Sequence, residues 1–163
     1  MPLKKLTLLS LFTTISLAVY AIESAVPPLV PIPGIKLGLA NIVTLVLLRR
    51  FRAADALMVL FCRILLSALL FGQALSLLYS LAGGLTSLLV MCIVTRLLRN
   101  KRVYLTGAMG GLTHNMGQLL TAYAVTATGG VFAYLPFLAL SGVITGLFTG
   151  LCSGFLNKYL ECV

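Results

Sequence analysis

The sequence predicts an all-α integral membrane protein, a bundle of six transmembrane helices. Of its 163 residues, 60% are hydrophobic and only 9% are charged, and the mean hydropathy is +1.11. Soluble domains carry about 25% charged residues and about 45–50% apolar ones, so the scarcity of charge assigns the chain to the membrane class. The length fits one membrane domain over residues 1–163, with no room for a separate soluble domain.

Six apolar segments follow one another along the chain. A hydrocarbon core about 30 Å thick needs about 20 helical residues to cross it. The second segment is short and follows a run rich in proline and glycine, so we expect it to begin from a bent, partly extended connector. The expected helices cover approximately residues 6–24, 36–49, 55–72, 76–98, 103–126 and 132–156.

Basic residues gather in the loops on one side of this arrangement. Cytoplasmic loops carry such an excess of lysine and arginine, so both termini are predicted to be cytoplasmic. The net charge of +9 therefore indicates orientation in a lipid bilayer and not binding to nucleic acid. Ten of the 12 basic residues lie on this side: Lys4, Lys5, Arg49, Arg50, Arg52, Arg96, Arg99, Lys101, Arg102 and Lys158.

The connector between the first two segments holds the most distinctive run of the chain. Residues 31–41 read Pro-Ile-Pro-Gly-Ile-Lys-Leu-Gly-Leu-Ala-Asn, and Glu23 closes the segment before them. Ionisable groups inside a membrane are costly, so this glutamate and Lys36 mark a candidate site. We expect the connector to cover a pocket that opens to the outer face, with Gly34 and Asn41 also at its wall.

A second polar cluster lies on the fifth segment. Gly107, Gly111, His114 and Gln118 follow at spacings of four, three and four, so they share one helical face, and Asn115 lies beside them. A single histidine in a helical bundle is often a structural residue with satisfied hydrogen bonds. The two neighbouring amides favour contact with a ligand.

Arg63 lies midway along the third segment. A charge there costs about 2.5–3.5 kcal/mol on insertion scales. The arginine either reaches backbone carbonyls or the membrane surface, or it binds an anionic group or Glu23. Tyrosines near the outer ends of the segments either form an interfacial belt or rim the pocket: Tyr20, Tyr79, Tyr123 and Tyr134.

Small residues recur at helical spacing in the first and last segments. Such rows let another helix backbone approach closely in lipid. They serve either packing within the bundle or docking of a partner subunit. The rows consist of Ala18, Ala21 and Ala25 in the first segment, and Gly142, Gly146, Gly150 and Gly154 in the last.

The sequence lacks the residues that several kinds of metal, cofactor and nucleotide site require. The four cysteines form no CxxC pair and there is one histidine, so neither a metal site nor a cofactor is expected. The single aspartate, Asp55, cannot supply the aspartate cluster that holds Mg²⁺ and a diphosphate. No phosphate-binding loop of the GxxxxGK[ST] type is present. The sequence therefore predicts a protein that is not an enzyme.

Glu23, the run at 31–41 and the run Gly-Leu-Thr-His-Asn-Met-Gly-Gln at 111–118 resemble the Gx transporter family. Its members are often labelled heptaprenyl diphosphate synthase component I. The family is similar to the substrate-binding S components of energy-coupling factor (ECF) transporters. The resemblance implies a multi-pass protein of the bacterial inner or plasma membrane, which captures a small ligand under the first loop. A transmembrane coupling subunit and ATPases would come from other chains.

Two other functions stay open. One is a non-catalytic membrane factor in prenyl diphosphate or quinone metabolism, or in a linked redox pathway. The other is a purely structural helix-packing protein, which the polar residues inside the membrane disfavour. The ligand is also open, since Lys36 and Arg63 suit an anionic group while the many apolar side chains suit an apolar body.

Overall fold

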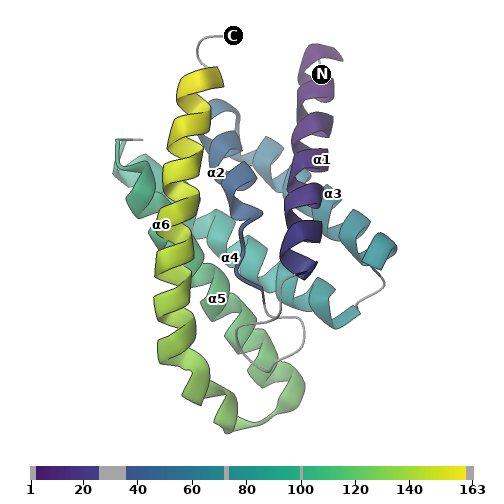
Figure 1. Ribbon diagram of the computed structural model, residues 1–163, viewed down its shortest axis with the longest axis vertical. Coiled ribbons are helices and arrows are strands. Elements are labelled where there is room, and N and C mark those ends of the chain that lie inside the picture. The colour runs from purple at the N-terminus through teal and green to yellow at the C-terminus, as the bar shows by residue number, and fades with distance from the viewer. Residues whose placement is uncertain (1–2, 26–35, 72–73, 100, 161–163) are drawn as a thin grey trace.

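The computed structural model of the chain describes residues 3–25, 36–71, 74–99 and 101–160. Both ends of the described chain lie at the same end of the bundle (Figure 1). The helices are α1 (Leu3–Ala25), α2 (Asn41–Arg50), α3 (Ala53–Phe71), α4 (Ala74–Leu97), α5 (Val103–Thr126) and α6 (Leu135–Leu160), with a 3-10 helix, η1 (Gly129–Tyr134), directly before α6.

The helix expected over residues 36–49 begins five residues later, at Asn41. Gly38 has a φ of +81°, which lies in the left-handed region and interrupts a right-handed helix. The backbone N–H groups of Gly38 and Leu39 both donate to the carboxylate of Glu23 on α1. Ten helical residues rise about 15 Å, half of a hydrocarbon core about 30 Å thick. By itself, α2 is therefore too short to cross a membrane.

The distribution of side chains is that of a membrane protein, with apolar groups outside and polar groups inside. Leu69 is 81% exposed and Phe155 is 65% exposed, whereas Arg63, His114 and Gln118 are at most 4% exposed. Within the part of the chain that the structure describes, four helical stretches are long and apolar enough to cross a membrane: α1, α3, α4 and Gly129–Tyr159. The chain is a multi-pass membrane protein with an all-helical fold.

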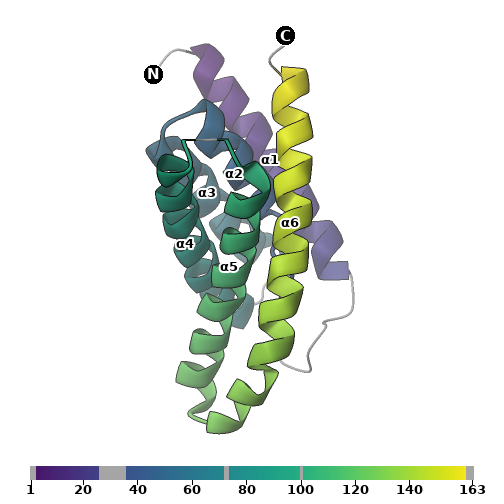
Figure 2. The same ribbon diagram turned by 90° about the vertical axis from the view of Figure 1, so that its left-hand side faces the viewer.

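The helix with the most polar interior face is α5, which lies between α4 and α6 (Figure 2). His114, Asn115 and Gln118 are buried in the bundle, whereas the exposed residues of α5 include Met109 and Leu120. Because its polar residues are covered by protein and not by lipid, α5 can occupy the membrane although its composition is less apolar than that of its neighbours.

Glycines bring the backbones of α5 and α6 into direct contact. A Cβ atom on Gly146 would lie 2.4 Å from the carbonyl oxygen of Gly107, and one on Gly142 would lie 2.7 Å from that of Gly111. A Cβ on Gly150 would lie 2.7 Å from the Cα of Tyr104, also on α5. These three α6 glycines therefore pack against α5 within the chain, as the first of the two alternatives for the row has it.

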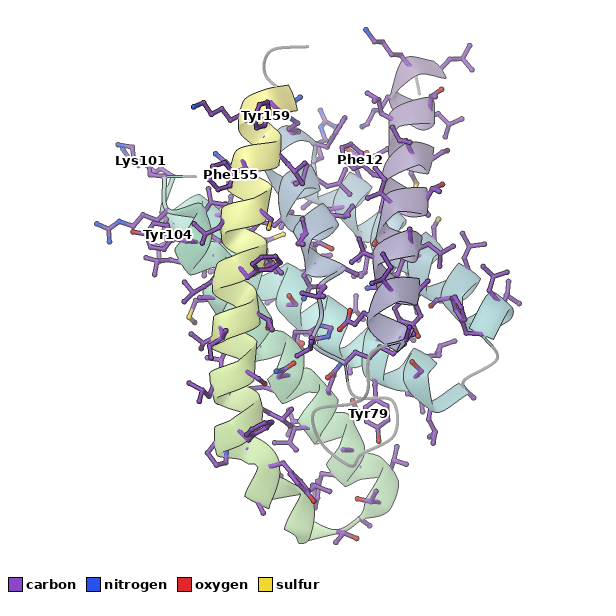
Figure 3. The ribbon with its side chains drawn as sticks, viewed as in Figure 1. Phe12, Tyr79, Lys101, Tyr104, Phe155 and Tyr159 are labelled. Atoms are coloured by element: carbon purple, nitrogen blue, oxygen red, sulfur yellow. The ribbon has the colours of Figure 1, made fainter. Side chains whose placement is uncertain are left out.

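Polar contacts tie the helices together at the end that carries both termini. Lys5 of α1 forms a salt bridge with Asp55 of α3, with 2.7 Å between Nζ and Oδ1. Arg50, the last residue of α2, donates from Nε to Oδ1 of Asn157 on α6 at 3.2 Å. Figure 3 shows Lys101 near this end of the bundle. Two exposed aromatic residues, Phe155 and Tyr159, also lie there, as expected of side chains at a membrane interface (Figure 3).

Candidate functional site

A buried polar pocket lies where α1, α3, α4, α5 and the residues that lead into α2 meet. Its volume is about 10 Å³, the room of about one water molecule. The polar side chains themselves thus fill most of the site in this conformation. The pocket is lined by Tyr20, Glu23, Lys36, Gly38, Ala40, Asn41, Arg63, Ser80, His114 and Gln118. Six of these were predicted as ligand contacts, namely Glu23, Lys36, Asn41, Arg63, His114 and Gln118.

Glu23 fixes the α2 end of the chain segment that covers the pocket, residues 36–40, which we call the 36–40 segment. The glutamate is 5% exposed. One carboxylate oxygen accepts the N–H of Gly38, and the other accepts the N–H of Leu39 at 3.1 Å. Hydrogen bonds to an ionised acceptor are about twice as strong as those between neutral groups. The carboxylate therefore substitutes for the helical hydrogen bonds that these two residues lack.

Lys36 holds the other end of the same segment. Its backbone N–H donates to Oε1 of Gln118 on α5 at 3.2 Å. Its Nζ donates to the hydroxyl of Ser24 and lies 3.5 Å from the centroid of the Tyr20 ring, a cation–π contact. The carbonyl of Leu37 accepts a long hydrogen bond, 3.4 Å, from Thr145 of α6. Side chains of α1, α5 and α6 thus hold the 36–40 segment over the pocket.

His114 occupies the floor of the pocket and is 4% exposed. Its Nε2 lies 3.0 Å from Nε2 of Gln118. Since Oε1 of Gln118 accepts from Lys36, its amide nitrogen donates, and His114 Nε2 must accept. This arrangement requires a neutral imidazole with its proton on Nδ1. Gly38 packs directly on the ring, since a Cβ atom there would lie 2.7 Å from Cδ2 of His114.

Arg63 brings a second cation to the pocket from the middle of α3. It is 3% exposed, and its Cζ lies 5.6 Å from the centroid of the Tyr20 ring. Its Nε forms no hydrogen bond with any residue that the structure describes. Glu23 shares the pocket, but both of its oxygens already accept backbone N–H groups. The arginine therefore lies in the protein interior with unused hydrogen-bonding capacity.

One predicted ligand contact, Asn115, is not among the residues that line this pocket. Asn115 points toward α6, where its Nδ2 donates to the carbonyl of Leu138 at 2.8 Å and to the hydroxyl of Ser141 at 3.2 Å. One residue corresponds to about 100° around a helix, so the neighbour of His114 faces a different helix. Its amide nitrogen thus joins α5 to α6, and contact of Asn115 with a ligand stays a prediction. Gly34 lies outside the described residues.

The pocket also contains Tyr20, for which the sequence left open a place at the pocket rim or in an interfacial belt. Tyr20 is 3% exposed, and its hydroxyl lies 2.8 Å from the hydroxyl of Ser76 on α4. It belongs to the pocket rim and not to an interfacial belt. Its spacing carried a signal, because Ser16, Tyr20 and Glu23 follow at intervals of four and three and are all buried on one face of α1.

The small residues of α1 lie on the outer surface of the bundle. Ala18 and Ala25 are exposed and Ala21 is partly exposed. On α6, a Cβ atom on Gly154 would meet no atom within 4 Å. Contact of these four residues with a partner helix stays a prediction.

Comparison with known families gives one match. A family model described as heptaprenyl diphosphate synthase component I matches residues 12–156. No curated protein matches the chain, and no solved structure does. Within the ranges that the structure describes, no group of three or more histidine, cysteine, aspartate or glutamate side chains is placed to hold a metal ion.

Proposed function

Since the chain belongs to the heptaprenyl diphosphate synthase component I family, also called the Gx transporter family, we propose that it is the membrane-embedded, substrate-binding subunit of an uptake transporter. It captures a small ligand from the outer face of a bacterial plasma membrane. It is not an enzyme, and a coupling subunit and ATPases from other chains supply the energy.

One observation carries this proposal: a short non-helical segment covers part of a polar pocket and is held there by a few side-chain contacts. The 36–40 segment contacts Glu23, Ser24, Gln118 and Thr145. A typical hydrogen bond contributes about 0.5–1.5 kcal/mol net, and one to a charged group about 1.5–3 kcal/mol. Exchange of these few bonds for bonds to a ligand opens the pocket without unfolding a helix.

The family description supports a second function, a non-catalytic part in prenyl diphosphate or quinone metabolism or a linked redox pathway. The chain has three acidic residues in total, of which one lies in the pocket. Mg²⁺ bound to a diphosphate needs several carboxylate oxygens. Any such role is therefore that of a membrane factor beside a separate catalytic chain.

The two functions separate in native mass spectrometry of the protein extracted gently from the membrane of its own host. We expect the wild type to retain a small molecule that Lys36→Ala loses, since Lys36 lines the pocket. Lys101→Ala removes the same charge at an exposed position outside the pocket and should retain the molecule.

Co-purifying coupling and ATPase chains would support the transporter further. A wild-type protein with neither a bound molecule nor these chains would contradict the proposal. Loss of prenyl product on deletion of the gene, together with that result, would favour the membrane factor.

A further inference from the structure

We propose that the ligand of this pocket is an organic acid with a single negative charge, and that Arg63 and Lys36 bind its carboxylate. This inference rests on the proposed function and specifies the class of substrate. It follows from the balance of charge in the pocket, from three buried donors that lack acceptors, and from the helix end that lines the same space.

The pocket has two cations and one carboxylate. The chain contains three acidic residues. Asp55 is paired with Lys5 at 2.7 Å, at the end of the bundle that carries the termini, and Glu161 follows the last residue of α6.

Residues 26–35 contain no ionisable side chain, so the remainder of the connector cannot change the balance of charge in the pocket. With His114 neutral, Glu23 is the one carboxylate that faces Lys36 and Arg63 among the residues that line the pocket. The site therefore has a formal excess of one positive charge.

Three buried donors in the pocket lack acceptors. Nε of Arg63, Nδ2 of Asn41 and the protonated Nδ1 of His114 form no hydrogen bond with any described part of the chain, and the three residues are 3%, 2% and 4% exposed. All three residues line the pocket. Buried donors are normally satisfied, and each exception needs an explanation. A carboxylate supplies acceptors only, and a guanidinium binds it through two parallel hydrogen bonds.

The end of α2 favours the same ligand. Ala40 and Asn41, at the N-terminus of this ten-residue helix, line the pocket. The N-terminus of a helix carries a partial positive charge of about half an elementary charge. A monoanion balances the excess charge of the site. A phosphate group, with a charge of about −1.5 to −2, would exceed it and would repel Glu23, which is needed to hold Gly38 and Leu39.

The test uses three series of small probes with the same body and different head groups. Acetate, hexanoate and benzoate are compared with their amides and with methyl, hexyl and phenyl phosphate, at equal millimolar concentration and ionic strength. Binding is measured on the purified full-length protein in detergent, as the shift in the melting temperature. We expect at least one carboxylate to raise the melting temperature of the wild type by several degrees, its amide to have no effect, and its phosphate counterpart to have a smaller one.

Three arginine variants assign the effect to Arg63. Arg63→Met keeps the length of the side chain without the charge and should abolish the shift, while Arg63→Lys keeps the charge without the planar fork and should retain part of it. Arg96→Met makes the same change at an exposed position near the end of α4 and should keep the full shift. If Arg63→Met does not fold, as judged by gel filtration and cooperative melting, Arg63→Lys and the head-group series still decide the question.

The outcomes separate this inference from the function on which it rests. If amides or phosphate esters stabilise the protein as well as the carboxylates do, the pocket binds ligands but the assignment of a monoanion is wrong. If no probe binds but native mass spectrometry finds a bound molecule, the charge of that molecule decides: a neutral or multiply charged compound contradicts the inference, and a monocarboxylic acid that Arg63→Met loses supports it. If no probe binds and no molecule is retained, both the function and the inference are wrong.

Discussion

At the scale of single residues, Glu23 shows why a carboxylate is placed inside this membrane protein. Its two oxygens accept the N–H groups of two consecutive residues, Gly38 and Leu39. A neutral amide at this position offers one acceptor oxygen and one donor group. One of the two backbone N–H groups would therefore have no acceptor, because the NH₂ group of the amide would face it in place of an oxygen.

We accordingly expect Glu23→Gln to lower the free energy of unfolding by about 1–3 kcal/mol, the cost of leaving a buried polar group unpaired. The measurement is thermal unfolding in detergent. Asp55→Asn is the matched control, since it makes the same chemical change at a carboxylate that accepts one backbone N–H, that of Arg52, and pairs with the partly exposed Lys5; it should cost less. Equal losses in the two variants would show that Glu23 does not hold the 36–40 segment.

Gly38 is the second sensitive residue, because its φ of +81° is unfavourable for any residue with a Cβ atom. Gly38→Ala should cost about 1–2 kcal/mol from the backbone alone, and the contact of the new methyl group with His114 adds to this. A lower melting temperature is expected. Gly130→Ala, where a Cβ atom would make only a contact of 3.6 Å with Thr128, should change it little. An unchanged melting temperature in Gly38→Ala would be inconsistent with the positive φ of this residue.

The residues of the site were predictable where helical spacing defines a face, and not where the answer depends on which helix lies opposite. The interval of four residues places His114 and Gln118 together in the pocket. The sequence gives no information on the neighbour that Asn115 meets, and its amide in fact bonds α6. The position of Arg63 over Tyr20 requires the packing of α3 on α1, which a pattern within one helix cannot reveal.

At the scale of elements, the contact between α5 and α6 depends on glycines that meet backbone to backbone. The sequence indicated a close helix contact through Gly146 and its neighbours, but left open whether the partner was α5 or another chain. Such a row has the same composition in both cases. In the structure, Gly107 and Gly111 supply the complementary row within this chain.

Gly146→Leu should therefore prevent normal assembly of the bundle. A Cβ atom at this position already lies 2.4 Å from the carbonyl oxygen of Gly107, and the backbone cannot move away without separating the helices. We expect little folded protein, seen as a loss of the monodisperse peak in gel filtration. Gly154→Leu adds the same side chain to the same helix at an open position and should leave that peak unchanged. Normal assembly of Gly146→Leu would contradict the observed packing.

The start of α2 shows the limit of an apolar pattern. Residues 36–40 are mostly apolar and precede a helical run, so the composition alone predicts helix. The positive φ of Gly38 and the bonds from Glu23 oppose it. Both are tertiary effects, because the glutamate lies 15 residues away in the sequence.

At the scale of the whole molecule, both ends of the described chain lie at one end of the bundle (Figure 1), as the sequence-based prediction of six segments with both termini on one side requires. The four strongly apolar stretches and the more polar α5 could be predicted from the amino-acid composition of each segment. Which side faces the cytoplasm stays a prediction from the basic residues, since the arrangement of the helices does not itself define inside and outside.

Labelling of single cysteines in whole cells tests this orientation. In a variant without the four native cysteines, Thr128→Cys, between α5 and η1, should react with a membrane-impermeant maleimide added outside. Lys101→Cys, between α4 and α5, should react only after the membrane is permeabilised. The reverse pattern would invert the predicted topology, and the pocket would then open toward the cytoplasm.

The short α2 also has a consequence for the biogenesis of the protein. A segment half the length of a membrane crossing is a poor substrate for the translocon, which recognises long apolar stretches. The apolar helices on either side, α1 and α3, are recognised individually, so the ribosome releases α2 before its final position can be stable. Only after α6 has been synthesised can Arg50 meet Asn157 and Leu37 meet Thr145. The contacts that hold α2 and the segment before it in place are thus completed last, although α6 supplies no side chain to the lining of the pocket. A chain that stalls before its final helix would leave these charged residues uncovered in the middle of the bilayer, where quality-control proteases can recognise them.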